Sequence, residues 1–179
     1  MSRFYITLDK IKGTKTLPDF SPITSIGDYG LYYAFYNCKG LTGSVSFPNL
    51  TTIGSYGLDY AFRNCTGLTG SVSFPNLTSV GESGLDSAFY FCTGLTSVSF
   101  PNLTSIGTNG LSSAFDGCTG LTSISFPSLN SIGSKGLYWV FYGCTSITEV
   151  HFKSSLSGNS ECTASNMGCT NATVYFDLP

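Results

Sequence analysis

Hydrophobic residues along this chain follow a helical spacing and then a strand spacing, and the two patterns alternate from residue 20 onward. One copy of the first pattern is GLSSAFDGC. Its apolar side chains stand at positions i, i+3, i+4 and i+7: Leu111, Ala114, Phe115 and Cys118. This is the spacing of one face over about two helical turns, and Gly120 stands where a left-handed residue would end a helix. The pattern therefore predicts a short helix in every copy.

The second pattern, LTSISF in the same copy, is that of a short strand. Ile124 and Phe126 alternate with Ser123 and Ser125, as in a strand that buries one face. The proline that follows lacks a backbone N–H and closes the strand. A second, shorter extended piece then leads into the next copy, so each copy is predicted to contribute strands to a sheet.

Together the two patterns form one repeat. Its aligned cysteines are 27, 27, 26 and 26 residues apart: Cys38, Cys65, Cys92, Cys118 and Cys144. The first two copies are longer by one glycine before the strand, Gly43 and Gly70, which predicts a bulge or a longer turn. One copy alone buries too little apolar surface to offset the entropy of ordering its backbone. Successive copies are therefore expected to stack as the coils of a solenoid.

The repeat resembles the BspA-like, or Treponema pallidum-type, leucine-rich repeat, whose usual unit is close to IGxxAFxxCxxLTSIxIPxSVTS. One copy matches that unit at these positions: Ile106, Gly107, Ala114, Phe115, Cys118, Leu121, Thr122, Ser123, Ile124 and Pro127. It departs in extra residues before the Ala-Phe pair and in a shorter turn after the strand. The resemblance covers residues 20–176 and implies a β-rich α/β fold. That fold is a right-handed leucine-rich-repeat solenoid of about six coils, with short strands plus short helices.

The same resemblance implies a function. Proteins of this family are found largely among bacterial surface and secreted proteins, and they are associated with adhesion to host or neighbouring cells. They usually carry a signal peptide and an anchor. The N-terminus MSRFYITLDKIKG has no apolar signal-peptide core, so the sequence itself leaves the location unknown, and only the resemblance points to the cell surface or to secretion.

One solenoid domain with a cap at each end is expected. The expected boundaries are a cap at 1–19, five repeats at 20–151, and a degenerate repeat with a C-terminal cap at 152–179. The first segment alternates apolar and polar residues, as a strand that covers an open edge would: Phe4, Ile6 and Leu8. A basic docking arm is the alternative for that segment. In the last segment, Asn166 or Met167 is expected to replace the phenylalanine of the repeat.

Charge and composition exclude several classes of partner. Only 10% of the residues are charged and the formal net charge is −2, so binding to nucleic acid or to a membrane surface has no electrostatic basis. No apolar run approaches the roughly 20 residues of a membrane-spanning helix. We therefore expect no nucleic-acid partner and no membrane insertion.

The seven cysteines are expected to be small buried hydrophobes with free thiols. Five of them occupy the repeat position described above, and Cys162 and Cys169 keep a similar spacing in the last segment. Stacked coils would bring neighbouring cysteines close to disulfide distance, so oxidation stays open. A metal site is not expected, because the chain has no CxxC motif and a single histidine. Nothing in the sequence predicts a cofactor.

The candidate binding residues are aromatic side chains between the core positions of the predicted helices. They would face outward or sideways and stack into a ridge: Tyr32, Tyr33, Tyr36, Tyr60, Tyr90, Tyr138, Trp139 and Tyr142. The ridge would be thinnest at the fourth copy, where Ser112, Ser113 and Asp116 stand. Tyrosine and tryptophan supply large contact areas at low entropic cost and are enriched at binding surfaces. The alternative is that these rings seal gaps between the coils.

Two other features carry weaker predictions. The outward strand positions are hydroxyl residues, which could hydrogen-bond a glycan or a protein edge or could simply be solvated fillers. Glu149 and His151, two residues apart on the last strand, could serve as an acid–base pair, but no accompanying nucleophile is evident. The Asn-Leu-Thr triplets match the glycosylation pattern only because the repeat contains them.

The sequence therefore predicts a non-enzymatic module, with no catalytic residue assigned. It would bind a protein or carbohydrate ligand through its repeat surface. The alternative is a structural or assembly subunit, for example of a phage or secretion-associated fibre. A hydrolase that uses His151 is the third and weakest interpretation.

Overall fold

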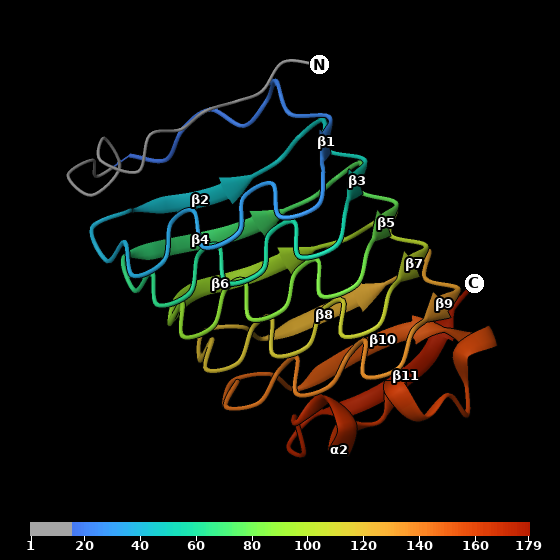
Figure 1. The fold of residues 1–179 in the computed structure, drawn as a ribbon. Helices are drawn as coiled ribbons and strands as arrows, with labels where there is room; N and C mark the ends of the chain where they lie inside the picture. The colour runs from blue at the N-terminus through green and yellow to red at the C-terminus, as the bar shows by residue number, and fades with distance from the viewer. Residues whose placement is uncertain (1–15) are drawn as a thin grey trace.

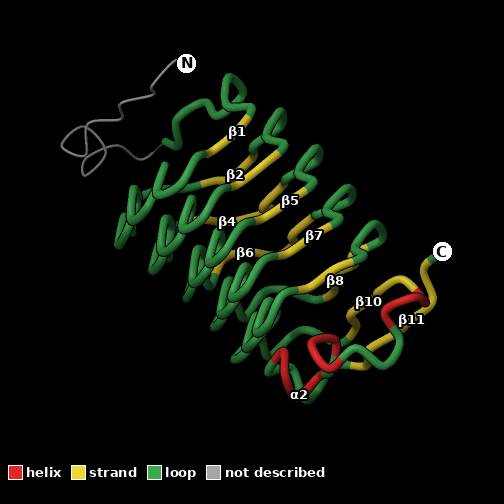
Figure 2. The backbone as a smooth tube through the Cα atoms, turned by 45° about the vertical axis from the view of Figure 1, so that its right-hand side comes forward, coloured by secondary structure: helices red, strands yellow, loops and turns green. Residues whose placement is uncertain are grey.

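The computed structural model describes residues 16–179. The described chain winds into successive coils that lie side by side, as Figures 1 and 2 show. The capping strand predicted over Phe4, Ile6 and Leu8 lies outside the described residues. The predicted solenoid is confirmed.

Three parallel sheets run along the stack of residues 16–179. Five two-residue strands form one sheet in the order β1 (Ser25–Ile26), β3 (Thr52–Ile53), β5 (Ser79–Val80), β7 (Ser105–Ile106) and β9 (Ser131–Ile132). The longer strands form two sheets, β2 (Gly43–Ser46), β4 (Leu68–Ser73) and β6 (Gly94–Ser99), then β8 (Ser123–Phe126), β10 (Glu149–Lys153) and β11 (Thr173–Leu178). Neighbouring strands in each sheet belong to successive coils, so the backbone ladder holds one coil on the next.

The longer strands bury one face, as predicted. Val45, Val72 and Ile124 point into the core, and serines point away from it. The outward serines are exposed or half-buried: Ser46, Ser73, Ser97, Ser99, Ser123 and Ser125.

The predicted irregularity at the two extra glycines is confirmed. Gly43 and Gly70 have φ of 92° and 85°, a left-handed conformation that costs glycine nothing. The strand register shifts after Gly43 between β2 and β4, and after Gly70 between β4 and β6. The longer copies thus absorb their additional residue as a bulge without disturbing the stack.

The short helix predicted in every repeat is wrong. The segments 27–38, 54–65, 81–92, 107–118 and 133–144 are chains of turns, seen in Figure 2 as non-helical tubes stacked on one another. Among the described residues, helices occur only near the C-terminus: η1 (Ser154–Leu156), η2 (Ser160–Cys162) and α2 (Ala164–Met167).

Hydrogen bonding explains why these segments are not helical. The N–H of Gly30 donates to the carbonyl of Gly27 at 3.0 Å, whereas the N–H of Leu31 donates to Gly57 of the next coil at 2.8 Å. This alternation continues along the segment, so every second N–H joins two coils instead of closing a helical turn. Backbone groups must be satisfied somewhere, and here half of them stack the solenoid.

A left-handed residue recurs every fourth position in these turns. The residues have φ between 47° and 72°: Tyr29, Tyr33, Asn37, Tyr56, Tyr60, Asn64, Ser83, Ser87, Phe91, Asn109, Ser113, Gly117, Lys135, Trp139 and Gly143. A four-residue turn unit returns the chain to the same side, so Leu58 and Phe62 both point inward. That spacing imitates the i, i+4 face of a helix, which is why the periodicity predicted one.

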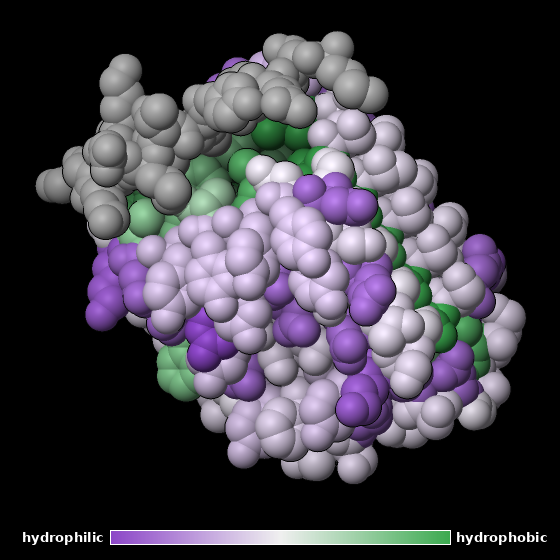
Figure 3. Space-filling model, viewed as in Figure 1, coloured by the Kyte–Doolittle hydropathy of each residue, from purple (hydrophilic) through white to green (hydrophobic). Residues whose placement is uncertain are grey.

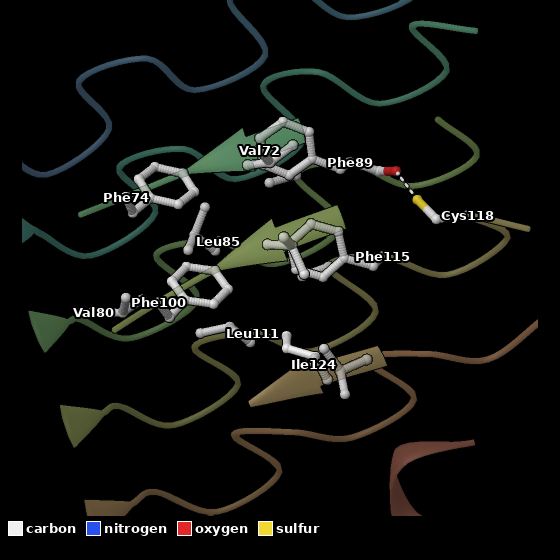
Figure 4. Packing of buried hydrophobic residues seen from close by; sticks show 14 of the residues in the cluster. Val72, Phe74, Val80, Leu85, Phe89, Phe100, Leu111, Phe115, Cys118 and Ile124 are labelled. Atoms are coloured by element: carbon white, nitrogen blue, oxygen red, sulfur yellow. Dashed lines mark hydrogen bonds between the residues drawn. The ribbon is translucent and has the colours of Figure 1, made fainter. Parts of the chain in front are cut away.

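The core consists of two columns of phenylalanine rings with aliphatic residues between them (Figure 4). One column is Phe20, Phe47, Phe74, Phe100, Phe126, Phe152 and Phe176, and the other is Phe35, Phe62, Phe89, Phe115 and Phe141. Neighbouring rings are nearly parallel, with centroids between 4.3 and 6.3 Å apart. Successive coils therefore bury the phenylalanines of these two columns against one another.

The cysteines line a third column. Four of the thiols donate to the carbonyl of a phenylalanine in the preceding coil, those of Cys65, Cys92, Cys118 and Cys144. Figure 4 shows the bond from Cys118 to Phe89, at 3.1 Å. Cys65 does the same to Phe35 at 3.0 Å, and burial raises the pKa of that thiol to about 12. Six of the seven cysteines are buried free thiols, as predicted, whereas Cys38 is half-buried.

Asparagine and threonine form further columns on the outside. The amide of Asn76 donates to the carbonyl of Pro48 in the preceding coil at 2.7 Å, and the hydroxyl of Thr78 donates to Thr51 at 3.0 Å. Both residues belong to one Asn-Leu-Thr triplet. The triplet therefore has a structural use, the joining of coils.

The last segment forms a shortened sixth coil. Strand β11 pairs with β10 in parallel, with Val150 opposite Val174. The N–H of Phe141 donates to the carbonyl of Met167 at 3.0 Å, as Phe115 does to Val140. Met167 thus takes the position before the phenylalanine, which corrects the expectation that it replaces the phenylalanine, and it is fully buried.

Candidate binding surface on the turn face

All eight predicted ridge residues lie on one surface, which we call the turn face. It consists of the turn segments 28–38, 55–65, 82–92, 108–118 and 134–144. The rings of Tyr32, Tyr33, Tyr36, Trp139 and Tyr142 are exposed, and those of Tyr60, Tyr90 and Tyr138 are half-buried. In the view of Figure 3 the described surface is mostly pale, the shade of weakly polar residues, with strongly hydrophilic residues in small groups between them.

The first two coils hold the larger group of rings. Tyr33 stacks on Tyr60 with centroids 4.7 Å apart, and Tyr29 stacks on Tyr56 at 5.0 Å. Tyr32 packs against Tyr33 at 4.5 Å. These tyrosines stand in the same positions of successive coils, so the repeat register itself brings their faces together.

The fifth coil holds a second, smaller group. Trp139 lies 4.9 Å from Tyr138 and 5.0 Å from Tyr142, nearly parallel to both rings. The ammonium group of Lys135 lies 5.9 Å from the centre of the Tyr138 ring. The residues that were predicted to form one ridge therefore form two groups, and Tyr90 lies between them, paired with Phe91.

Between the two groups lies a polar interval, at the coil where the sequence predicted the ridge to be thinnest. Ser112 and Ser113 are half-buried there and Asp116 is buried. On its N-terminal side, Tyr90 and Phe91 form a pair with centroids 4.8 Å apart. Phe91 also covers Gly117, because a Cβ at that glycine would lie 2.8 Å from the ring.

The sequence reasoning missed a cation at the centre of this surface. The guanidinium of Arg63 lies 3.9 Å from the centre of the Tyr90 ring and 5.0 Å from that of Tyr60. A guanidinium at that distance is attracted by the ring quadrupole. Alignment of the repeats offered a signal, since Arg63 is the one cationic residue in a column that otherwise holds Tyr36, Tyr90, Asp116 and Tyr142.

The sequence reasoning also gave no role to three carboxyl groups in coils two to four, those of Asp59, Asp86 and Asp116. Burial, with a contribution from the charge of Asp86, raises the pKa of Asp59 to about 7. Burial raises the pKa of Asp86 as well, although a hydrogen bond from Ser87 at 3.0 Å opposes the shift. Burial raises the pKa of Asp116 to about 6, and the charge of Arg63 opposes this. All three are therefore held where their ionised form is disfavoured.

Asp59 is the least satisfied of the three. The residue is only 5% exposed, and its Oδ1 atom has no hydrogen-bond partner among the described residues. A buried polar atom without a partner costs roughly 1–3 kcal/mol. Such an atom usually has an explanation outside the packing of the fold.

The second candidate site, around His151, lies on strand β10. Its Nδ1 is 3.0 Å from Oδ1 of Asp177, its Nε2 is 3.6 Å from Oε2 of Glu149, and its ring stacks on Tyr175 at 4.8 Å. The hydrogen bond with Asp177 is the main cause that raises the pKa of His151. The structure thus brings the predicted pair together and adds Asp177, which the sequence reasoning missed. The site is an ion-pair cluster on the sheet surface, and no described contact joins it to a nucleophile.

Two hollows lie at the ends of the described solenoid, away from the aromatic groups. One, of about 530 Å³, lies at the C-terminal end beside Cys162, Val174 and Phe176. The other, of about 360 Å³, lies at the N-terminal end beside Leu17 and Phe20. Within residues 16–179, no group of three or more histidine, cysteine or acidic residues could hold a metal ion, and no helix is long and apolar enough to cross a membrane.

Comparison with known proteins agrees with this architecture. Residues 24–162 match the BspA type leucine rich repeat region in six copies. The solved structure of the T. pallidum leucine rich repeat protein TpLRR is similar, with a TM-score of 0.57 and 24% sequence identity over 92% of this chain and 69% of that one. No curated protein matches the sequence. Because the family match covers most of the chain and the repeats stack as leucine-rich repeats do, the protein belongs to the BspA-type leucine-rich repeat family.

Proposed function

We propose that this protein is a non-enzymatic binding module that recognises a protein or glycan ligand through its turn face. The observation that carries the proposal is the placement of large aromatic residues at left-handed backbone positions. Tyr33, Tyr60 and Trp139 have φ between 52° and 56°. A non-glycine residue in this conformation costs roughly 1–2 kcal/mol.

The other coils show that the fold does not need aromatic residues there. Ser87 and Ser113 occupy the same column as Tyr33 and Trp139, and they keep the same left-handed conformation. Serine therefore supports the turn, and the exposed rings add contact area instead. Strained, exposed aromatic residues are more readily explained by ligand binding than by stability.

The family supports adhesion as the biological setting of this binding. The chain shares its repeats with BspA-type proteins, and the similar solved chain is described as a leucine rich repeat protein of T. pallidum. We extend the proposal to a role at a bacterial cell surface on this family likeness.

A screen with two matched variants tests the proposal. Tyr33→Ser/Trp139→Ser removes rings from the turn face and installs the residue that coils three and four already have there. Ser97→Ala/Ser123→Ala changes the strand face and serves as the control. Wild type and both variants are screened against displayed random peptides and a glycan array. We expect ligands that the turn-face variant loses and the strand-face variant keeps. Ligands kept by the turn-face variant, or lost only by the strand-face variant, would contradict the proposal.

An assembly subunit is the second candidate function. Strand β11 pairs with β10 on one side and with no described strand on the other, and the hollow beside Val174 and Phe176 lies at the same end. An open strand edge is a template for another chain. Sedimentation over a range of concentrations tests this candidate. A discrete oligomer that Val174→Asp abolishes would support it, and a monomer throughout would rule it out.

A further inference from the structure

We infer that the ligand of the turn face is a basic polypeptide, whose arginine or lysine side chains bind over an acidic strip in coils two to four. The acidic strip consists of Asp59, Arg63, Asp86, Tyr90 and Asp116. This inference rests on the proposed function, and it adds the chemical class of the partner.

The first argument is the charge of the turn face. The first four turn segments contain five carboxylates, Asp28, Asp59, Glu82, Asp86 and Asp116, and only one cationic residue, Arg63. The whole chain has a formal net charge of only −2, so negative charge is concentrated on this face. Such a face attracts a positively charged partner and accelerates its association.

The second argument is the environment of the Arg63 guanidinium, which shows which groups of the strip contact a cation. Its guanidinium lies over Tyr90 at 3.9 Å, and its charge acts on both Asp86 and Asp116. Yet both ion pairs among the described residues involve His151, so Arg63 neutralises neither carboxylate through a direct contact. A guanidinium is thus accommodated by the rings while the carboxylates keep their capacity to pair.

The third argument is the order of residues along one column. Arg63, Tyr90 and Asp116 occupy the same position in coils two, three and four. The N–H of Phe91 donates to the carbonyl of Asp116 at 2.7 Å, which fixes coil four in register beneath coil three. A cation, a ring and a carboxylate thus follow one another, and a further cation beside Asp116 would continue the alternation.

The fourth argument is independent of the charge count. Asp59 is nine-tenths buried or more, and its Oδ1 has no partner among the described residues. The charge of Asp86 in the next coil helps to raise the pKa of Asp59, so the two carboxyl groups repel one another when both are ionised. The charge of Arg63 offsets part of the effect of burial on Asp86, and a cation bound above Asp86 would offset more of the repulsion between Asp86 and Asp59.

The ring stacking favours a polypeptide over a glycan. A sugar ring stacks on an open aromatic face. Here one face of Tyr33 lies against Tyr60 at 4.7 Å, one face of Trp139 lies against Tyr138 at 4.9 Å, and Arg63 takes a face of Tyr90. Asp86 is the half-buried carboxyl group of the strip, whereas Asp59 and Asp116 are buried beside it. A guanidinium group matches a carboxylate in bidentate geometry.

A peptide pair tests the inference directly. The probe is an arginine–glycine repeat peptide, and its control is the same peptide with citrulline, which is uncharged and nearly the same shape, in place of arginine. Binding to the wild-type protein is measured by fluorescence anisotropy at physiological salt. We expect the citrulline peptide to bind at least about tenfold more weakly. Equal binding of the two peptides would overturn the inference.

Two charge-matched variants locate the site. Asp86→Asn/Asp116→Asn removes two negative charges from the strip, and Asp19→Asn/Glu149→Gln removes two from elsewhere. We expect the first to weaken the arginine peptide about tenfold and the second to change it less than about twofold. An equal loss in both would show attraction by overall charge alone and would overturn the inference. Thermal melts confirm that all variants are folded.

The outcomes distinguish a failure of the basic-ligand inference from a failure of the proposed binding function. If the ligands selected in the screen need Tyr33 and Trp139 but are neutral, acidic or glycans, turn-face binding stands and the basic partner is wrong. If the protein instead self-associates and deletion of residues 1–15 abolishes this, the strip binds the basic segment of a second copy, and the separate partner is wrong. If no ligand depends on the turn face, the proposed function itself fails.

Discussion

The strand face and the turn face belong to the same coils, yet they differ in how freely their residues vary. On the strand face, Ser73, Ser99 and Ser125 recur with little change, because any small β-compatible residue satisfies a solvated strand. On the turn face, one column reads tyrosine, tyrosine, serine, serine and tryptophan: Tyr33, Tyr60, Ser87, Ser113 and Trp139. Positions that are the same in every coil are those that the stacking requires. Positions that vary between coils are not fixed by stacking and are available for ligand recognition.

The energetic character of the two faces differs as well. Threonine and asparagine columns outside the turn segments satisfy hydrogen bonds between coils, as Thr104 does with Thr78 at 2.9 Å. The turn face instead contains features that lower the stability of the fold. They are a left-handed backbone conformation at Tyr60 and a carboxyl oxygen of Asp59 without a hydrogen-bond partner among the described residues. Natural proteins tolerate such local conflicts mainly at functional sites.

The largest expected effect would test whether both faces depend on one core. Phe89 lies under the turn face and Phe100 under the strands, and both are buried. Replacement of either by alanine should lower the free energy of unfolding by about 3–5 kcal/mol, in one cooperative denaturant transition. Two separate transitions, or a loss below about 1 kcal/mol, would break the comparison by showing that the faces are stabilised independently.

The next effect concerns the loss of stability caused by the buried carboxyl group of Asp59 on the turn face. The pKa of Asp59 is raised to about 7 in the folded protein from about 4 when unfolded, so between these pH values the folded state binds a proton that the unfolded state does not. Stability should therefore fall as pH rises from 4 to 7. Asp59→Asn should be more stable than the wild type at pH 8, by on the order of 2–4 kcal/mol, with the difference vanishing near pH 4.

Thermal or denaturant melts across this pH range measure the Asp59 effect. Asp19→Asn is the control, since hydrogen bonds from Ser21 lower the pKa of Asp19, and its removal should not stabilise the protein at pH 8. A wild-type stability that rises between pH 4 and pH 7 would contradict the assignment of a cost to the turn face.

A third, smaller effect compares the stability cost of an alanine substitution at two glycines, one on the turn face and one outside it. At Gly117, φ is 72° and a Cβ would meet the Phe91 ring at 2.8 Å, so Gly117→Ala should cost roughly 1–2 kcal/mol. Gly40 has open space around the same atom, and Gly40→Ala should be nearly neutral. Denaturant midpoints compare the two variants. Equal midpoints would mean that Phe91 does not rest on the turn as described.

The smallest effect lies on the strand face, where His151 is the only histidine. Its pKa is raised, chiefly by the hydrogen bond with Asp177. The pair therefore contributes stability below the unfolded histidine pKa of about 6.5, and that contribution is lost as pH rises through the folded pKa. Proton NMR of the single imidazole should show a pKa above 6.5, and Asp177→Asn should lower it. An exposed pair of this kind contributes at most about 1 kcal/mol.

Much of the fold could be predicted because the same pattern of apolar positions occurs in five copies. The recurrence of Phe89 and Phe115 predicted a column, and the alternation of Ile124 with serine predicted the buried strand face. The helix prediction failed because a left-handed residue such as Ser113 at every fourth position yields the same apolar spacing. Single-sequence periodicity cannot distinguish the two, since backbone φ carries no hydrophobic signature.

The candidate surface was predicted less completely. The aromatic residues were recognisable by type, but their division into two groups depends on which rings meet across coils. The contact of Arg63 with Tyr90 joins residues 27 positions apart. Such a contact follows only from the register of stacking, which the repeat alignment contains but which local spacing does not reveal.

The buried thiols can report where two neighbouring coils of the solenoid separate. Cys92 donates to Phe62 and Cys144 donates to Phe115 across coil boundaries, and burial raises the pKa of both thiols well above the ordinary value for cysteine. A thiol in that state is inert to alkylating reagents until its two coils separate. The order in which these cysteines become labelled would therefore trace, boundary by boundary, where the stack begins to come apart.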